Sequence, residues 1–158
     1  MKILLIFVSL SIGFVSVGQD DFVQTVQTAK QSLRDQLDTL SYDGSKVTYF
    51  KYRDKTYYKG LQIPVFLREN YVFFLSGAAA DDKVTVQFFD KPMESNNRIL
   101  LYEIKNISGN EAVIDLNELR KRITVYGESP ESLRSVFIDY EIKKSRTERG
   151  AVVLVLGY

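Results

Sequence analysis

The sequence predicts a mainly β fold: a β-sandwich of about seven to nine strands with one N-terminal amphipathic helix packed on it. Three observations support this prediction. Apolar residues recur every three or four positions over residues 20–41, alternate with polar residues in short runs from residue 46 onward, and are interrupted by turn residues at intervals of roughly ten. Because no helix-length segments alternate with the strands, a doubly wound α/β fold is not expected.

The first eighteen residues are typical of a signal peptide. Lys2 gives a positive start, residues 3–15 are an apolar run too short to span a bilayer, and Ser16-Val17-Gly18 offers a small-residue cleavage site. An uncleaved anchor or a buried first strand are the alternatives. We expect a signal peptide at 1–18 and one domain at 19–158, exported to the periplasm, the cell surface or the extracellular space. No later stretch approaches the length of a membrane span, so none is expected after signal removal.

Residues 20–41 are expected to form the helix, with Asp20 or Asp21 capping its first N–H groups and the turn Asp43-Gly44 ending it. The apolar stripe predicts a face that packs on the domain's own sheet, and a partner or coiled-coil seam is the alternative. The stripe consists of Phe22, Val26, Ala29, Leu33, Leu37 and Leu40.

The rest of the chain is expected to alternate between short strands and turns. Pro64 favours an edge position because proline cannot donate to a sheet ladder. Residues 151–156 are apolar on both faces, which indicates a central strand covered on both sides. Residues 115–122 predict a single helical turn. The expected strands are 46–52, 56–61, 61–67, 71–75, 84–89, 99–104, 113–114, 136–142 and 151–156.

Composition excludes several classes of function. The chain has 158 residues, which suits one domain, and it contains no histidine and no cysteine. These absences exclude Ser-His-Asp and Cys-His catalysis, disulfides, thiolate ligands and nearly all zinc sites. Lysine and arginine total 21 against 20 aspartates and glutamates, so the chain as a whole has no pull toward nucleic acid. We expect no cofactor and no metal.

An aromatic and basic cluster at residues 49–58 is the main candidate binding site. Tyrosine rings can stack on sugars while neighbouring cations reach hydroxyl groups. The alternative is a β-hairpin around Arg53-Asp54-Lys55, with alternate aromatics in the core and lysines that protect an exposed edge. Strand alternation allows only about half of the rings to share one face. The candidate ligand-binding residues are Tyr49, Tyr52, Tyr57, Tyr58, Lys51 and Arg53.

Two groups of carboxylates are weaker candidates. Asp81, Asp82 and Asp90 could offer oxygens to calcium, but their spacing matches no calcium loop, and we interpret them as polar turns. Asp139 and Glu141 share one strand face and could form the acid and base of a glycosidase. We expect them instead to be solvated carboxylates opposite a buried face.

Several strand segments carry a family resemblance. They are LQIPVFL at 61–67, NYVFFLSG at 70–77, DKVTVQFFD at 82–90, RSVFIDYE at 134–141 and GAVVLVLGY at 150–158. With these segments in this order, the sequence resembles a group of short secreted proteins common in Bacteroidetes and, more distantly, the jelly-roll pre-peptidase C-terminal modules of bacterial exoenzymes. It lacks the paired cysteines of many of those secreted proteins and a clear acidic calcium motif. The resemblance implies a β-sandwich in a bacterial envelope and transfers no active site.

Together these features predict a non-enzymatic envelope or secreted module that binds or supports a partner, either an envelope protein or a polysaccharide. One alternative is a carbohydrate-binding module that uses the aromatics at 49–58. Another is a carboxylate-based hydrolase. A sugar-binding module should expose several coplanar rings, and a hydrolase needs a concave site with converging carboxylates.

Overall fold

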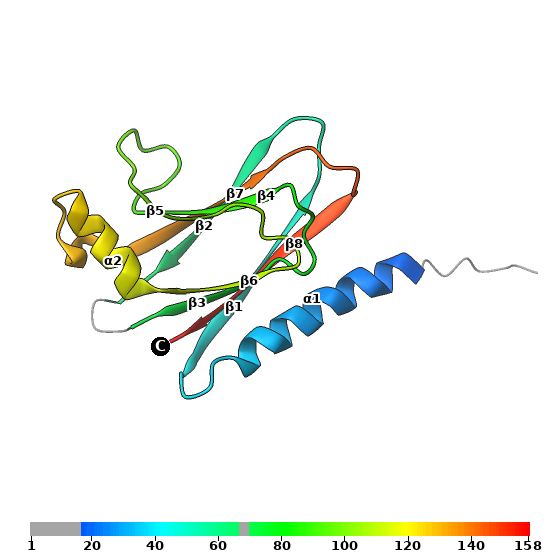
Figure 1. Cartoon of the computed structure of the whole chain (residues 1–158), viewed down its shortest axis with the longest axis horizontal. Coiled ribbons are helices and arrows are strands. Elements are labelled where there is room, and N and C mark those ends of the chain that lie inside the picture. The colour runs from blue at the N-terminus through cyan, green and yellow to red at the C-terminus, as the bar shows by residue number, and fades with distance from the viewer. Residues whose placement is uncertain (1–16, 67–69) are drawn as a thin grey trace, which may run out of the picture.

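The computed structural model describes residues 17–66 and 70–158. The predicted signal segment therefore lies almost wholly outside the described residues. Two four-stranded antiparallel sheets stack face to face, and a long helix lies against the outer face of one of them (Figure 1). This arrangement confirms the predicted β-sandwich with a helix packed on it. No helix in the described part of the chain is long and apolar enough to cross a membrane.

The described residues form eight strands, two α-helices and one short 3-10 helix. One sheet has the strand order β1-β8-β3-β6 and the other has the order β2-β7-β4-β5. The elements are α1 (Val17–Asp35), β1 (Tyr42–Lys51), β2 (Tyr57–Pro64), β3 (Val72–Ser76), β4 (Val84–Phe89), β5 (Leu100–Ile104), β6 (Glu111–Asp115), α2 (Leu116–Val125), η1 (Pro130–Ser132), β7 (Ser135–Ile142) and β8 (Arg149–Gly157).

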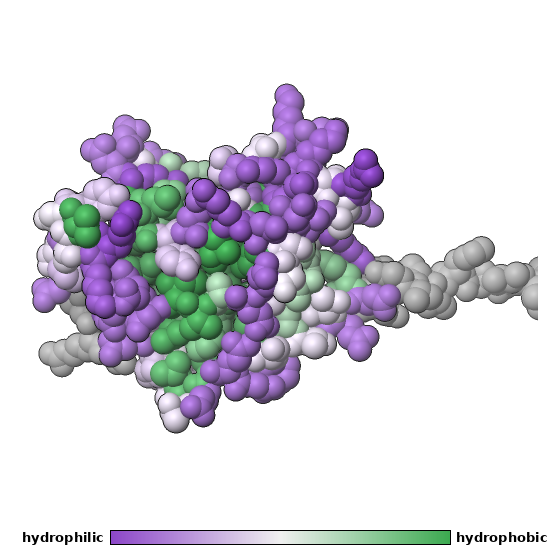
Figure 2. All heavy atoms as spheres, in the orientation of Figure 1, coloured by the Kyte–Doolittle hydropathy of each residue, from purple (hydrophilic) through white to green (hydrophobic). Residues whose placement is uncertain are grey.

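Two layers of apolar side chains hold the molecule together. The main core fills the space between the sheets and includes Phe73, Phe88 and Ile138, all fully buried. A second layer joins α1 to the outer face of the first sheet, where Leu33 packs with Val153. Figure 2 shows hydrophobic side chains gathered between β5 and β6, with hydrophilic side chains over the surrounding surface. Burial of the helix stripe confirms that it packs on the domain's own sheet.

Strand β8 lies between β1 and β3, as the prediction of a doubly covered central strand requires. Val152, Leu154 and Leu156 face the main core, whereas Val153 and Val155 face α1. Each successive side chain therefore contributes to a different apolar layer, which explains the absence of alternation in this segment.

The end of α1 differs from the prediction. The helix ends at Asp35, and the chain turns through the left-handed backbone of Asp38, at φ 49°. Asp43-Gly44 is not the turn that ends the helix, because it lies inside β1 at a register irregularity. The prediction that Asp20 or Asp21 caps the helix was also wrong, since the helix begins at Val17.

The predicted hairpin around Arg53-Asp54-Lys55 is wrong. β1 pairs with β8 in one sheet and β2 pairs with β7 in the other, so residues 52–56 carry the chain between sheets. The two strands expected at 56–61 and 61–67 form one strand, β2, which lies at a sheet edge as Pro64 suggested. As a result β1 and β2 are edge strands of opposite sheets, joined by a short connection.

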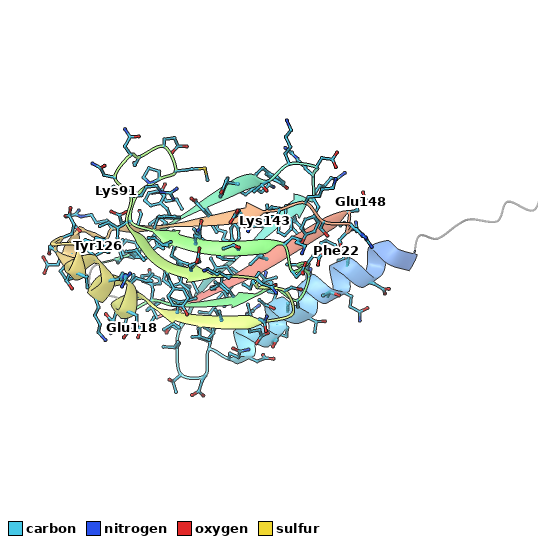
Figure 3. The ribbon with its side chains drawn as sticks, turned by 45° about the horizontal axis from the view of Figure 1, so that its top comes forward. Phe22, Lys91, Glu118, Tyr126, Lys143 and Glu148 are labelled. Atoms are coloured by element: carbon cyan, nitrogen blue, oxygen red, sulfur yellow. The ribbon has the colours of Figure 1, made fainter. Side chains whose placement is uncertain are left out.

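The segment predicted as one helical turn is the ten-residue helix α2. Asp115 caps it by accepting a hydrogen bond from the Asn117 N–H (2.7 Å). Leu116, Leu119 and Ile123 are buried on one face, as their spacing predicted. This helix covers an end of the sandwich remote from the N-terminal end of α1 (Figure 3).

Candidate functional site

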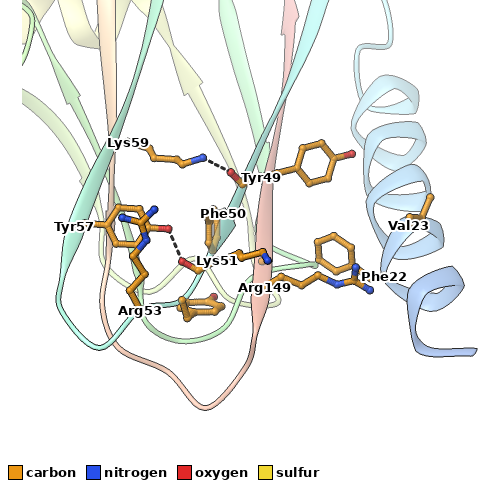
Figure 4. A pocket seen from close by; sticks show the side chains of 11 residues that line it. Phe22, Val23, Tyr49, Phe50, Lys51, Arg53, Tyr57, Lys59 and Arg149 are labelled. Carbon is orange, nitrogen blue, oxygen red and sulfur yellow. Dashed lines mark hydrogen bonds between the residues drawn. The ribbon is translucent and has the colours of Figure 1, made fainter. Parts of the chain in front are cut away.

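An open groove of about 640 Å³ lies beside the free edge of β1. It collects side chains from α1, β1, β2 and the start of β8 (Figure 4). Figure 3 shows Phe22, on α1, near Glu148, which precedes β8. The lining residues are Phe22, Val23, Tyr49, Phe50, Lys51, Tyr52, Arg53, Tyr57, Lys59, Arg149 and Gly150.

Alternation along β1 divides its aromatic residues between core and groove. Phe50 points inward and is 4% exposed, whereas Tyr49 points outward and is 53% exposed. The Tyr49 ring lies beside that of Phe22, with centroids 6.3 Å apart and planes tilted by 55°. The outward ring of Tyr49 is therefore the aromatic surface in the groove with the greatest access to a ligand.

Two side chains of β2 cap the unpaired edge of β1. The Tyr57 hydroxyl donates to the Lys51 carbonyl (2.5 Å), and the Lys59 ammonium donates to the Tyr49 carbonyl (2.5 Å). Both bonds satisfy backbone acceptors that an edge strand leaves without a partner. These two bonds also link β1 to β2 and so fix the two sheet edges relative to each other.

Tyr52 is part of the groove wall and is held by a neighbouring loop. Its hydroxyl accepts a hydrogen bond from the Asp81 N–H (2.7 Å), and its ring meets Phe50 edge to face at 5.4 Å. Burial raises the pKa of the Tyr52 hydroxyl. Tyr52 therefore remains neutral, and because its oxygen accepts from Asp81, its O–H group is still available as a donor.

The groove is positively charged. Its lining includes Lys51, Arg53, Lys59 and Arg149, and no aspartate or glutamate of the described chain lines it. The Arg53 guanidinium lies 4.5 Å from the Tyr57 ring centroid. The Arg149 guanidinium lies 4.6 Å from that of Phe22. Both guanidinium groups therefore lie against aromatic rings of the groove lining.

Gly150 keeps the groove open where β1 meets β8. A Cβ at this position would lie 2.5 Å from the Phe50 ring, too close for any real contact. A side chain here would push Phe50 out of the core and alter the groove floor.

Five of the six predicted binding residues come together here: Tyr49, Lys51, Tyr52, Arg53 and Tyr57. Tyr58 does not, because it points from the opposite face of β2 and is 50% exposed on the outside of the second sheet. Predicting Phe22, Val23 and Arg149 required knowledge that the first turns of α1 lie beside the start of β8. Phe22 belonged to a stripe interpreted as core, and no local signal distinguished it.

The expected solvation of Asp139 is wrong. Its side chain is buried, with the residue 3% exposed, and its carboxylate pairs with the Arg98 guanidinium at 2.6 Å. Arg98 in turn stacks 3.6 Å from the Phe89 ring centroid, so the polar 90–98 loop folds back over the sheet. Glu141 lies near Lys143 instead (3.6 Å). The two carboxylates are occupied by separate cations and do not converge.

The three aspartates considered for calcium perform structural roles. Asp81 accepts hydrogen bonds from Ser145 and Thr147, and Asp90 accepts one from the Ile99 N–H (2.6 Å). No group of three or more acidic residues in the described ranges could hold a metal ion. These contacts support their interpretation as polar turn residues.

No family model matches the chain, and no curated protein matches it. Among solved structures, the chain is similar to a carbohydrate-binding module of the endoglucanase Cel5A from Eubacterium cellulosolvens. The match has 21% sequence identity and a TM-score of 0.39, and it covers 75% of this chain and 96% of that chain. At this identity and TM-score the similarity assigns neither a ligand nor a function to this chain.

Proposed function

We propose that this protein is a non-catalytic module that binds a carbohydrate chain in the groove between α1, β1 and β2. The observation that carries the proposal is the half-exposed Tyr49 ring, held by Phe22 within a groove of about 640 Å³ and surrounded by hydrogen-bond donors. A groove of this volume is within the range of small-ligand sites.

The side chains suit a sugar in two ways. A tyrosine ring offers a flat apolar body to the apolar face of a pyranose and a hydroxyl at its tip. Lys51 and Arg53 add N–H donors that can reach ring hydroxyls, since neither forms an ion pair with a described residue. One face of the sugar would thus stack on the Tyr49 ring, while its hydroxyl groups would accept hydrogen bonds from Lys51 and Arg53.

The ring geometry favours a single soluble chain over a crystalline polymer surface. Tyr49 and Phe22 are tilted by 55°, and Phe50 and Tyr52 are nearly perpendicular at 88°. These rings do not form the flat, coplanar platform that a crystalline face would need. A groove with one accessible ring fits a short stretch of one chain.

The lining also favours binding without cleavage. Glycoside hydrolysis uses two carboxyl groups that flank the scissile bond, and the described groove is lined by none. The carboxylates considered for that role, Asp139 and Glu141, each lie beside a cation elsewhere.

The test is calorimetry with a panel of soluble neutral and acidic polysaccharides, comparing wild type with Tyr49→Ala and Tyr58→Ala. Tyr58 is a matched control because it is a half-exposed tyrosine outside the groove. Loss of the stacking ring should weaken binding by about tenfold or more, as at binding hot spots. Tyr58→Ala should bind like wild type. Equal binding by both variants, or no binding to any polymer, contradicts the proposal.

We also propose that the chain is exported, on the signal features of residues 1–18. Cleavage after Gly18 would retain every residue that lines the groove. Intact-mass measurement of the protein from its native host should give a chain that begins near Gln19. Recovery of the full-length chain from the cytosol would refute export.

A further inference from the structure

The charge of the groove narrows the class of sugar. We infer that it selects acidic polysaccharides, whose residues carry carboxylate groups, over neutral ones. This inference rests on the proposed function and specifies its ligand. Its basis is the positive charge of the lining, the absence of ion pairs at Lys51 and Arg53 among the described residues, and the aromatic content of the groove.

Positive charge is concentrated in the groove. The whole chain carries a formal net charge of only +1, yet four of the eleven lining residues are cationic and none is acidic. A lining of mostly apolar surface weakens screening, so the field of these cations acts more strongly on a bound anion than it would in open solvent. The electrostatic preference for anions therefore acts on a ligand within the groove, and the chain as a whole does not attract polyanions from a distance.

Three of the groove cations, Lys51, Arg53 and Lys59, retain capacity for a carboxylate. Lys51 and Arg53 form no ion pair within residues 17–66 and 70–158. The Arg53 guanidinium stacks by its face on Tyr57, which leaves its N–H edge for bidentate bonds. The Lys59 ammonium donates one of its three N–H groups to the neutral Tyr49 carbonyl, which leaves two donors. Asp54, the acidic neighbour of Arg53 in sequence, pairs with Lys144 (3.0 Å).

The aromatic content favours an acidic glycan over other polyanions. Single-stranded nucleic acid uses successive stacked bases on several rings, whereas Tyr49 is the one large lining aromatic that is more than half exposed. An extended acidic peptide would gain from ladder bonds to the free edge of β1, but Tyr57 and Lys59 already occupy carbonyls of that edge. One stacking ring beside several cations matches a sugar that carries a carboxylate.

The test compares two ligands with the same backbone: polygalacturonate and its methyl ester, in which methyl groups mask the carboxylate charges. Alginate and hyaluronan extend the acidic set. Calorimetry of the chain that lacks residues 1–18 should show at least about tenfold tighter binding of an acidic polymer than of the ester, with affinity falling as salt is raised. Lys51→Gln combined with Arg53→Gln should remove that preference by weakening the binding of the acidic polymer far more than that of the ester, because glutamine keeps N–H donors but carries no charge. Lys55→Gln, on the same connection but outside the groove, should bind like wild type.

Equal affinity for polygalacturonate and its ester overturns the inference and leaves the proposed function standing. Binding to no polysaccharide overturns both. Tighter binding of polyglutamate or single-stranded DNA than of any acidic glycan overturns the choice of ligand class. An unchanged melting temperature shows that the double variant is folded, so that its loss of preference reports on charge.

Discussion

Asp81 connects three segments beside the groove, and its ionisation should be visible in stability. Its carboxylate accepts hydrogen bonds from the Ser145 hydroxyl, the Asp82 N–H (2.7 Å) and the Thr147 hydroxyl (2.9 Å). These bonds, that from Ser145 above all, lower the pKa of Asp81 from 3.8 to about 2. Because the carboxylate form is favoured in the folded state, the stabilisation is present above the unfolded-state pKa and is lost as pH falls toward the folded-state value.

Asp81→Asn should therefore lower the free energy of unfolding at pH 7 and remove part of the stability lost between about pH 4 and about pH 2. Urea denaturation at several pH values measures both effects. Asp82→Asn is the control, since Asp82 makes an exposed ion pair with Lys83 and should contribute less than about 1 kcal/mol. Parallel pH profiles for wild type and Asp81→Asn would show that these hydrogen bonds do not stabilise the ionised carboxylate.

The buried pair of Arg98 and Asp139 predicts a second residue-scale effect. Removing one member leaves an uncompensated charge beneath the 90–98 loop, so Asp139→Ala should destabilise the fold by about 3 kcal/mol. Replacing both members, as Arg98→Met with Asp139→Leu, should recover much of that loss. Glu141→Ala, two residues along the same strand, should cost less than about 1 kcal/mol because its ion pair is long (3.6 Å) and its partner Lys143 is exposed. Denaturation midpoints that are equal for the two single variants would contradict this account.

Among the elements, helix α1 is expected to contribute to the stability of the domain through its buried stripe. Leu33 is fully buried against Val153 and its neighbours, so Leu33→Ala should cost about 2–5 kcal/mol of unfolding free energy. Gln27→Ala, on the exposed face of the same helix, should change stability by less than about 0.5 kcal/mol. Chemical denaturation gives both values. An unchanged midpoint for Leu33→Ala would mean that the helix is docked only weakly and its stripe is available to a partner.

The sequence predicted elements best where one period dominated. The stripe of α1 and the doubly buried β8 follow directly from apolar spacing, and both are confirmed. Prediction failed where a local signal had two structural solutions. Asp43-Gly44 fits a turn or a bulge, and tertiary pairing with β8 selects the bulge. Arg53-Asp54-Lys55 fits a hairpin or a crossing between sheets, and the pairing partners of β1 and β2 decide which.

Only part of the groove could be predicted from the sequence. Aromatics and cations at 49–57 are contiguous in sequence, so their clustering could be predicted. Phe22 and Arg149 join them only because α1 crosses the sheet beside the start of β8. Burial of Asp139 was missed because its partner, Arg98, comes from a loop forty-one residues earlier.

At the scale of the whole molecule, β8 is the element that no other part can replace. It pairs with both β1 and β3 and supplies side chains to both apolar layers. Deleting residues 151–158 should therefore abolish cooperative folding, whereas deleting Tyr158 alone should preserve it. Circular dichroism and thermal melting distinguish the two products. A truncated chain that still melts cooperatively would show that the sandwich closes without β8.

The central claim is that the groove beside β1 is the binding site of the molecule. The most direct measurement is the backbone amide spectrum of the labelled chain that lacks residues 1–18, titrated with a trimer of galacturonic acid. The largest shifts should fall on the residues that line the groove, namely Phe22, Val23, Tyr49, Phe50, Lys51, Tyr52, Arg53, Tyr57, Lys59, Arg149 and Gly150. Shifts confined to the outer face of the second sheet, around Tyr58 and Phe137, or no shifts at saturating trimer, would contradict it.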